Sequence, residues 1–156
     1  METACIRTPL GIATVIGDEN GVSVISVANN GEVSVAIPEV LQESVSQLND
    51  YFDGKRNDFT FKLNPKGTDF QQKVWKGLLE IPFGKTMSYM DLSKKLGDVK
   101  AIRAVASANG KNPLWIVVPC HRVIGTDGSL TGYAGGLWRK KWLLEHENPT
   151  NQQSLF

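Results

Sequence analysis

A cysteine followed by a histidine and an arginine is the feature of this sequence best suited to chemistry. Cys120, His121 and Arg122 follow the apolar run 114–118, which predicts a buried strand that delivers them to its end. Cationic neighbours lower the pKa of a thiol and favour the thiolate, which is the nucleophile. Unpaired cysteines are also among the most buried residues, so a purely structural role for Cys120 stays open from this segment alone.

Two further side chains could complete a nucleophilic site. The carboxylate of Glu147, near the C-terminus, is suited to accept a hydrogen bond from one imidazole nitrogen of His121 while the other nitrogen serves the thiol. Because adjacent residues rarely face each other, we expect a water or a helical turn between Cys120 and His121. Tyr133 lies in the glycine-rich segment 125–136 and offers an aromatic wall for a planar ligand, although such a segment also suits a flexible connector.

Helices with clear capping signals must position these residues. Helices are predicted from 68 to 79, from 89 to 96 and from 98 to 108, with Thr68, Ser88 and Asp98 as their caps and Gln71 completing a capping box. The last two, separated by Gly97, have the spacing of a helix-turn-helix, although many helical hairpins share it. Core contacts are predicted for apolar residues of the first helix and of a C-terminal helix at 137–146: Phe70, Val74, Trp75, Leu78 and Leu79, then Trp138, Trp142 and Leu143.

The helix at 101–108 has a composition that suits DNA. Arg103 is its one long cationic side chain, and alanine and serine fill most other positions. Small side chains let a helix enter the minor groove, which is only about 6 Å wide, although close packing in the core explains them equally well. Residues 1–64 hold four Lys/Arg and nine Asp/Glu, whereas residues 65–156 hold thirteen and seven. The basic half therefore favours a polyanionic partner, with an ordinary uneven surface charge as the alternative.

The first half predicts a small sheet with one helix and no chemistry. Segments 12–16, 22–27 and 32–37 carry β-branched residues between turn signals and predict a meander, with one more strand at 59–63. Pro38 opens an amphipathic helix that ends near Gly54. Cys5 is the only cysteine here. With two cysteines in 156 residues, no leader pattern and no apolar run long enough to span a bilayer, the chain is expected in a reducing, intracellular compartment.

Several segments together resemble the O6-alkylguanine-DNA alkyltransferases, also called methylated-DNA–protein-cysteine methyltransferases. The resemblance rests on Asn-Pro at 112–113, Pro-Cys-His-Arg-Val at 119–123, Gly-Tyr-Ala-Gly-Gly at 132–136 and Trp-Leu-Leu-Glu-His-Glu at 142–147. It covers residues 68–147 almost continuously and is weaker over 1–63. It implies an α+β fold, with a ribonuclease H-like sheet-plus-helix domain at 1–64 and a mainly helical, winged helix-turn-helix domain at 65–156.

The resemblance also implies a reaction, in which the protein flips O6-alkylguanine out of duplex DNA and transfers the alkyl group irreversibly to its own cysteine. Cys120 would be the acceptor, so that one molecule repairs one lesion. His121 would take the thiol proton through a water, and Glu147 would hold His121. Activity on O4-alkylthymine and the preferred alkyl size stay open.

Roles in binding the flipped base are implied for a further set of residues. Tyr89 would rotate the 3′ phosphate, contact the base and support it as it leaves, and Asn112 would link the recognition helix to the active-site loop. The carbonyls of Cys120 and Val123 would receive the guanine amino group. The amide of Ala134, which stands where some relatives have serine, would donate to O6, and Tyr133 would wall the pocket.

The implied partner is double-stranded DNA, bound through the minor groove without sequence preference. Arg103 would fill the gap left by the extruded nucleotide, and the same contact surface would include Tyr89, Ala104, Ser107 and Arg122. Extrusion is required because the alkyl carbon cannot reach a buried sulfur while the base is stacked. We expect a monomer in the cytoplasm, on the nucleoid in a bacterium, with no membrane association.

No cofactor and no metal are expected. Thiolate displacement needs neither, and the cysteine and histidine ligands that hold zinc in the N-terminal domain of some relatives are lacking here, since Cys5 stands alone in that half. Two other function classes fit the sequence less well. A non-catalytic lesion binder would lack Cys120, and a thiol hydrolase would not explain Arg103 within a helix of small residues.

Overall fold

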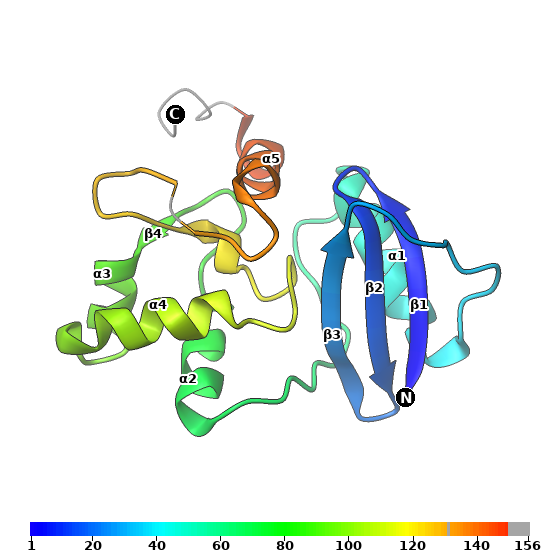
Figure 1. Ribbon diagram of the computed structural model, residues 1–156, viewed down its shortest axis with the longest axis horizontal. Helices are drawn as coiled ribbons and strands as arrows, with labels where there is room; N and C mark the ends of the chain where they lie inside the picture. Colours follow the sequence, from blue (N-terminus) through cyan, green and yellow to red (C-terminus); the bar gives the residue numbers. More distant parts are fainter. Residues whose placement is uncertain (131, 150–156) are drawn as a thin grey trace. The chain divides into compact units, whose positions relative to one another are not determined.

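The computed structural model describes residues 1–130 and 132–149, which form two compact units. One unit holds residues 1–66 with 113–117, and the other holds residues 67–112 with the chain from 118 onward. The predicted division at 64/65 placed 113–117 in the second domain, whereas the structure groups this segment with the first unit. The elements of both units are drawn in Figure 1, and the predicted α+β class is confirmed.

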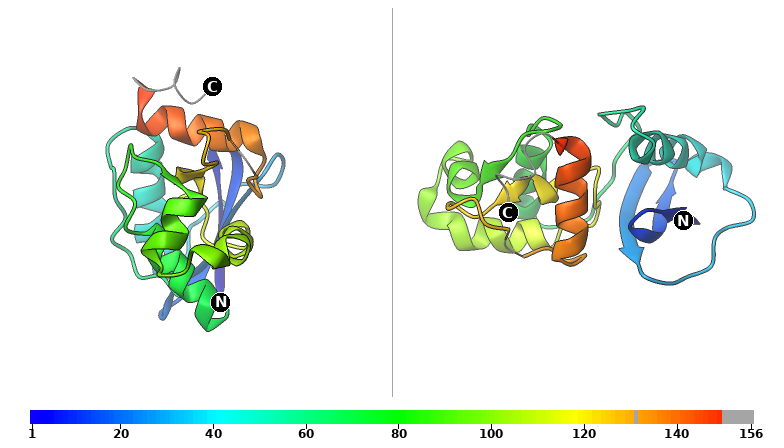
Figure 2. Two further views of the ribbon diagram at one scale, coloured as in Figure 1. Left: turned by 90° about the vertical axis from the view of Figure 1, so that its left-hand side faces the viewer. Right: turned by 90° about the horizontal axis from the view of Figure 1, so that it is seen from above.

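The first unit is built on a three-stranded antiparallel meander. Its strands are β1 (Glu2–Thr8), β2 (Gly11–Asp18) and β3 (Gly21–Ala28), in the order β1-β2-β3. The short helix η1 (Glu39–Leu41) and helix α1 (Gln42–Phe52) follow, and α1 lies along one face of the sheet (Figures 1 and 2). Gly54 follows α1 with φ of 76°, a conformation that glycine adopts without strain, so the predicted helix after Pro38 is confirmed.

The strand set of this unit differs from the prediction. The predicted strand at 32–37 is wrong: Val33 and Val35 are exposed, and the segment is tied to β1 only through Ser34, whose amide donates to the Cys5 carbonyl at 2.8 Å. Its β-branched residues had no buried face to cover. The third strand is β1, which the sequence analysis missed, and which buries Ala4 and Ile6 in alternation.

The predicted strand at 59–63 is also wrong. Only Leu63 forms an isolated bridge, to Val22, and Thr60 is held instead by the buried side chain of Gln47, whose Oε1 accepts from the Thr60 amide at 2.8 Å. A hydrogen bond to the Gln47 side chain therefore takes the place of the backbone hydrogen bonds of the strand that the alternating sequence predicted.

The apolar run before the cysteine is buried as predicted but is not a strand. Leu114 alone bridges to Ile25 of β3, through the amide of Ile25 donating to the Pro113 carbonyl at 2.8 Å and the Trp115 amide donating back to Ile25 at 3.0 Å. Ile116 then has φ of 76°, which turns the chain out of an extended conformation. Pairing with β3 explains why this segment belongs to the first unit.

The second unit is mainly helical. In chain order it contains α2 (Asp69–Leu78), β4 (Met87–Ser88), α3 (Tyr89–Lys95), η2 (Val99–Ala101), α4 (Ile102–Gly110), η3 (Cys120–Arg122), β5 (Val123–Ile124) and α5 (Leu137–Glu147), with β4 and β5 paired in parallel. The Thr68–Gln71 capping box is present, and Ser88 and Asp98 each cap the element that follows. Helices α3 and α4 pack together across the turn at Gly97, as a helix-turn-helix requires.

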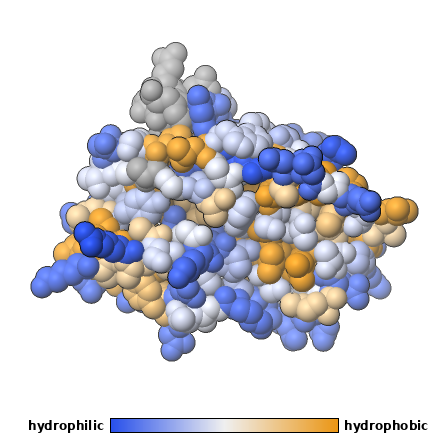
Figure 3. Space-filling view, in the orientation of Figure 1, coloured by the Kyte–Doolittle hydropathy of each residue, from blue (hydrophilic) through white to orange (hydrophobic). Residues whose placement is uncertain are grey.

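Part of the predicted helical core is exposed. On α2, Val74, Trp75 and Leu78 are buried and the Trp75 indole donates to the Ala108 carbonyl at 2.9 Å, but Phe70 and Leu79 at the ends of the stripe are exposed. Trp138 of α5, also predicted to be core, is 52% exposed, with the guanidinium of Arg139 over its ring at 4.6 Å. Figure 3 shows exposed apolar residues as separate groups on a largely hydrophilic face. Among the described residues, no helix is long and apolar enough to cross a membrane.

Candidate active site

The turn η3 places three consecutive functional side chains inside the second unit. Cys120, His121 and Arg122 are 5%, 0% and 6% exposed. The turn is closed by its own backbone, since the Cys120 amide donates to Val118 at 2.8 Å and the Arg122 amide donates to Pro119 at 3.0 Å. Helix α5 packs against η3 and brings its last residue, Glu147, to the same place (Figures 1 and 2).

Glu147 binds both residues that follow the cysteine. Its Oε2 lies 2.7 Å from Nε2 of His121, and Nε of Arg122 donates to its Oε1 at 2.7 Å. Burial alone would raise the pKa of the Glu147 carboxyl, but the charge and hydrogen bond of His121, together with Arg122, hold that pKa well below its ordinary value. Glu147 is therefore a buried carboxylate that only accepts hydrogen bonds.

This contact fixes the tautomer of His121. Because a carboxylate only accepts, Nε2 of His121 must carry the hydrogen that faces Glu147. In the neutral ring, Nδ1 is then the proton acceptor. Nδ1 is buried and has no hydrogen-bond partner among residues 1–130 and 132–149. The neutral ring therefore presents an accepting nitrogen that no described residue engages.

Arg122 supports this arrangement from inside the protein. Besides its two bonds to Glu147, its guanidinium donates to the Ile81 carbonyl at 2.7 Å and lies 5.8 Å from the ring centre of Phe83. The resemblance implies a place for Arg122 on the DNA-contact surface, but its buried head group is directed at Glu147 and Ile81. We therefore assign Arg122 to holding Glu147.

The thiol of Cys120 is less acidic than its cationic neighbours suggested. Burial raises its pKa to about 11, and the hydrogen bond from the Asn112 side chain and the charge of Lys140 only partly oppose that rise. The expectation of a depressed thiol pKa is thus wrong for the protein without DNA, because desolvation outweighs the nearby charge. A base is consequently needed to make the thiolate.

Lys140 is a site residue that the sequence analysis missed. It is fully buried on α5, its Nζ donates to the Gly132 carbonyl at 3.4 Å, and it lies 6.0 Å from the ring centre of Tyr89. Burial lowers its pKa to about 8, and the charge of Cys120 opposes that change. The signal was its spacing: Lys140 lies two helical turns before Glu147, so both face the same side of α5.

The loop between β5 and α5 carries Tyr133 and Ala134. Tyr133 is half-buried, and burial, followed by the charge of Cys120, raises the pKa of its hydroxyl well above the ordinary value. Ala134 is exposed. The loop is held by the Gly136 amide, which donates to the Tyr133 carbonyl at 2.9 Å, and by Arg139, which donates to the Gly135 carbonyl at 2.8 Å.

The remaining predicted residues divide between the site and a helix surface. Asn112, just after α4, donates to the Val118 carbonyl at 2.8 Å, and Val123 begins β5 immediately after the cysteine turn. Tyr89 begins α3 and contacts buried Asn109 of α4, a residue not singled out from sequence. Arg103, Ala104 and Ser107 all lie exposed on α4, whereas Val105, Ala108 and Asn109 are buried.

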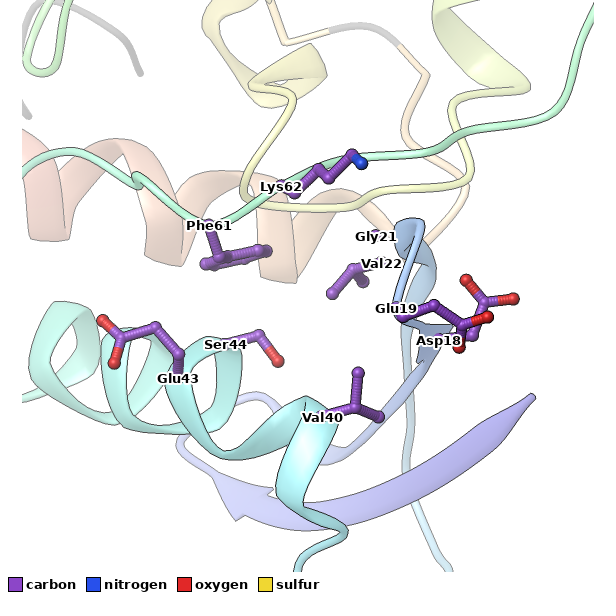
Figure 4. A pocket seen from close by; sticks show the side chains of 9 residues that line it. All are labelled: Asp18, Glu19, Gly21, Val22, Val40, Glu43, Ser44, Phe61 and Lys62. Atoms are coloured by element: carbon purple, nitrogen blue, oxygen red, sulfur yellow. The ribbon is translucent and has the colours of Figure 1, made fainter.

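The first unit offers no comparable chemistry. One pocket of this unit has Val22, Val40 and Phe61 facing inward and the carboxylates of Asp18 and Glu43 at its edge (Figure 4). In the part of the chain that the structure describes, no group of three or more His, Cys, Asp or Glu residues is placed to hold a metal ion.

Comparison with known proteins identifies both parts of the chain. Residues 69–149 match the family model of the 6-O-methylguanine DNA methyltransferase DNA-binding domain, and residues 1–65 match that of the ribonuclease-like domain of the same methyltransferase. A methylated-DNA–protein-cysteine methyltransferase of Methanosarcina barkeri is 44% identical over 149 residues, covering 91% of this chain and 94% of that protein.

Solved structures agree with this match. The O6-methylguanine methyltransferase of Mycobacterium tuberculosis is 42% identical and superposes with a TM-score of 0.85 over 95% of this chain and 93% of that chain. A complex of Mycobacterium tuberculosis OGT with DNA is 41% identical, also with a TM-score of 0.85, over 99% of this chain and 94% of that chain. The fold, the buried cysteine turn and these likenesses lead to one conclusion: the chain belongs to the methylated-DNA–protein-cysteine methyltransferase family.

Proposed function

We propose that this protein repairs DNA by moving the alkyl group of O6-alkylguanine onto Cys120. The observation that carries the proposal is the buried contact between Nε2 of His121 and Glu147 at 2.7 Å, one residue beyond the cysteine. It leaves the remaining ring nitrogen to act as the base for the neighbouring residue's thiol, which needs one. The Methanosarcina barkeri relative supports the proposal, because its name describes transfer from methylated DNA to a protein cysteine.

The transfer follows from the properties of these groups. His121 accepts the thiol proton at Nδ1 through a water, and the ammonium of Lys140 favours the thiolate that forms. The sulfur attacks the alkyl carbon, a C–S bond forms, and the C–O6 bond breaks with its electron pair passing to guanine. Tyr89 donates the proton that the leaving base requires, and release of the thiol proton from His121 to solvent and its uptake by the Tyr89 phenolate complete the proton balance. The product is a thioether on Cys120, which water does not hydrolyse, so each molecule reacts once.

The exposed side of α4 is the surface proposed to meet duplex DNA. Arg103, Ala104 and Ser107 lie on that side, and the short side chains of Ala104 and Ser107 allow a close approach to the minor groove. Arg103 takes the place of the extruded nucleotide. Such contacts read little sequence, which suits a protein that must find lesions anywhere, and one molecule suffices for one lesion.

The flipped base is proposed to lie between the cysteine turn and the loop before α5. The Val123 carbonyl receives the guanine amino group, the amide of Ala134 donates to O6, and Tyr133 and Asn112 shape the pocket. We propose that the protein acts in the cytoplasm, on the nucleoid in a bacterium, because the reaction needs DNA and a reduced thiol.

Intact mass spectrometry tests the proposal. The protein is mixed with duplex DNA that carries one O6-methylguanine, and we expect its mass to increase by one methyl group. Cys120→Ala should show no increase, and Cys5→Ala is the matched control that should react like wild type. Removal of the lesion without any change in protein mass would refute the proposal.

A further inference from the structure

The buried side of α4 carries an asparagine that the mechanism above does not use. Asn109 is 4% exposed, and its Nδ2 lies 3.5 Å from the hydroxyl oxygen of Tyr89 and 3.5 Å from the carbonyl oxygen of Cys120. These atoms belong to the residue proposed to protonate the leaving base and to the nucleophile. The carboxamide of Asn109 therefore contacts both the proposed proton donor and the backbone of the nucleophile.

The Cys120 carbonyl fixes the orientation of this amide. A carbonyl only accepts hydrogen bonds, so the group that faces it must be the NH2 and not the oxygen. The same NH2 has only hydrogens to offer, so the Tyr89 hydroxyl must accept from it. The phenol proton is consequently directed away from Asn109, as donation to a leaving base requires.

The Cys120 carbonyl has a second donor. The amide of Val123 also donates to it and closes the turn η3. Because a carbonyl oxygen has two lone pairs, Asn109 and the backbone of the turn can share it. The side chain of α4 is thereby connected to the backbone that positions the sulfur.

The other end of the carboxamide argues against a packing role. Oδ1 of Asn109 is buried and, among the described residues, has no hydrogen-bond partner. A leucine would fill similar space without leaving an acceptor unsatisfied, so packing alone does not account for an amide at this position. Both Nδ2 contacts are long, as catalytic hydrogen bonds commonly are before substrate binds and tightens them.

We propose that Asn109 is a positioning residue for alkyl transfer, whose Nδ2 holds the Tyr89 hydroxyl beside the Cys120 carbonyl and directs the phenol proton toward the base. The inference rests on the proposed function, since it assigns a task within that reaction. It predicts that Asn109 acts chiefly through the Tyr89 hydroxyl, which separates it from a residue that merely stabilises the fold.

A double-mutant cycle tests this prediction. Single-turnover methyl transfer from O6-methylguanine in duplex DNA is measured for wild type, Asn109→Leu, Tyr89→Phe and the double variant. We expect Asn109→Leu to slow transfer about tenfold in the wild-type background and less than about twofold in the Tyr89→Phe background. The same fold loss in both backgrounds, or no loss at all, would overturn the proposal.

Controls separate the possible causes of a change. Gln47→Leu removes a buried amide from the first unit and should lower thermal stability without changing the rate. Asn109→Ala repeats the cycle with a smaller side chain if Asn109→Leu does not fold. A wild-type protein that gains no methyl group refutes the proposed function itself, whereas a reactive wild type with an equally fast Asn109→Leu variant refutes only the role of Asn109.

Discussion

Replacing Glu147 with glutamine perturbs the network behind Cys120 with almost no change in shape. Arg122 donates to both carboxylate oxygens, at 2.7 and 3.0 Å, so either orientation of the glutamine amide sets its NH2 against an Arg122 donor. Breaking a buried ion pair in this way costs about 3–5 kcal/mol. Since domains are commonly stable by about 5–15 kcal/mol, we expect Glu147→Gln to be folded but less stable.

The effect on the reaction follows from the thiol. With the pKa of Cys120 at about 11, about one molecule in 10⁴ carries the thiolate near pH 7, a cost of about 5 kcal/mol. General-base catalysis by His121 recovers about 10²–10⁴ in rate, and it depends on the carboxylate that stabilises the protonated ring. We therefore expect Glu147→Gln to slow transfer by at least about 10²-fold.

Single-turnover transfer measured from about pH 7 to about pH 9 separates this cause from general damage. Below the thiol pKa, each increase of one pH unit raises the thiolate fraction about tenfold, so the transfer rate of the variant should rise about tenfold per pH unit. The transfer rate of wild type should rise less steeply. Glu145→Gln, on the same helix and 34% exposed, is the matched control and should react normally. A folded Glu147→Gln variant with the wild-type rate near pH 7 would refute the role of Glu147.

Three further predictions test the surroundings of the site and the fold. Lys140→Met should raise the pKa of Cys120 above about 11 and slow transfer about tenfold. The exposed neighbour Lys141 provides the control, since Lys141→Met should change neither the pKa nor the rate. Equal rates for the two variants would contradict the role assigned to Lys140. Because the folded-state pKa of Glu147 is depressed, its stabilisation is present above the ordinary carboxyl pKa of about 4.3 and lost as pH falls. The difference in unfolding free energy between wild type and Glu147→Gln should therefore shrink from about pH 6 to about pH 3, and a constant difference would count against it. Thr68→Ala should lower the stability of the second unit by about 1 kcal/mol in chemical denaturation, through loss of the capping box, and an unchanged midpoint would show that the cap does not matter.

Features set by neighbouring residues could be predicted from the sequence. The capping box of Thr68 and the caps at Ser88 and Asp98 depend on side chains within three residues, and the structure has all of them. The prediction of a strand at 32–37 was wrong because β-branched residues indicate an intrinsic preference for strands but do not indicate which face a sheet will bury. The predicted burial of Phe70 and Trp138 was wrong for a similar reason, since helical spacing does not show where the neighbouring element that would cover a side chain ends.

The reacting residues of the site were predictable from the sequence, but Lys140, Asn109 and the energetics of the thiol were not. Cys120, His121 and Glu147 were found from residue type and resemblance, and the structure brings His121 and Glu147 into contact. The sequence could not show that burial outweighs charge at the thiol, because desolvation depends on the whole fold. The sequence also could not show that the Arg122 side chain turns inward, because its partners Glu147 and Ile81 lie far from Arg122 along the chain.

The central claim is that Cys120 is consumed as it repairs a lesion. It is tested most directly by titrating the protein with excess duplex DNA carrying O6-methylguanine, then counting repaired lesions and mapping the modified peptide. The account predicts one lesion repaired per molecule, no further repair afterwards, and the methyl group on Cys120. Continued repair beyond one lesion per molecule, or a methyl group on any other residue, would contradict it.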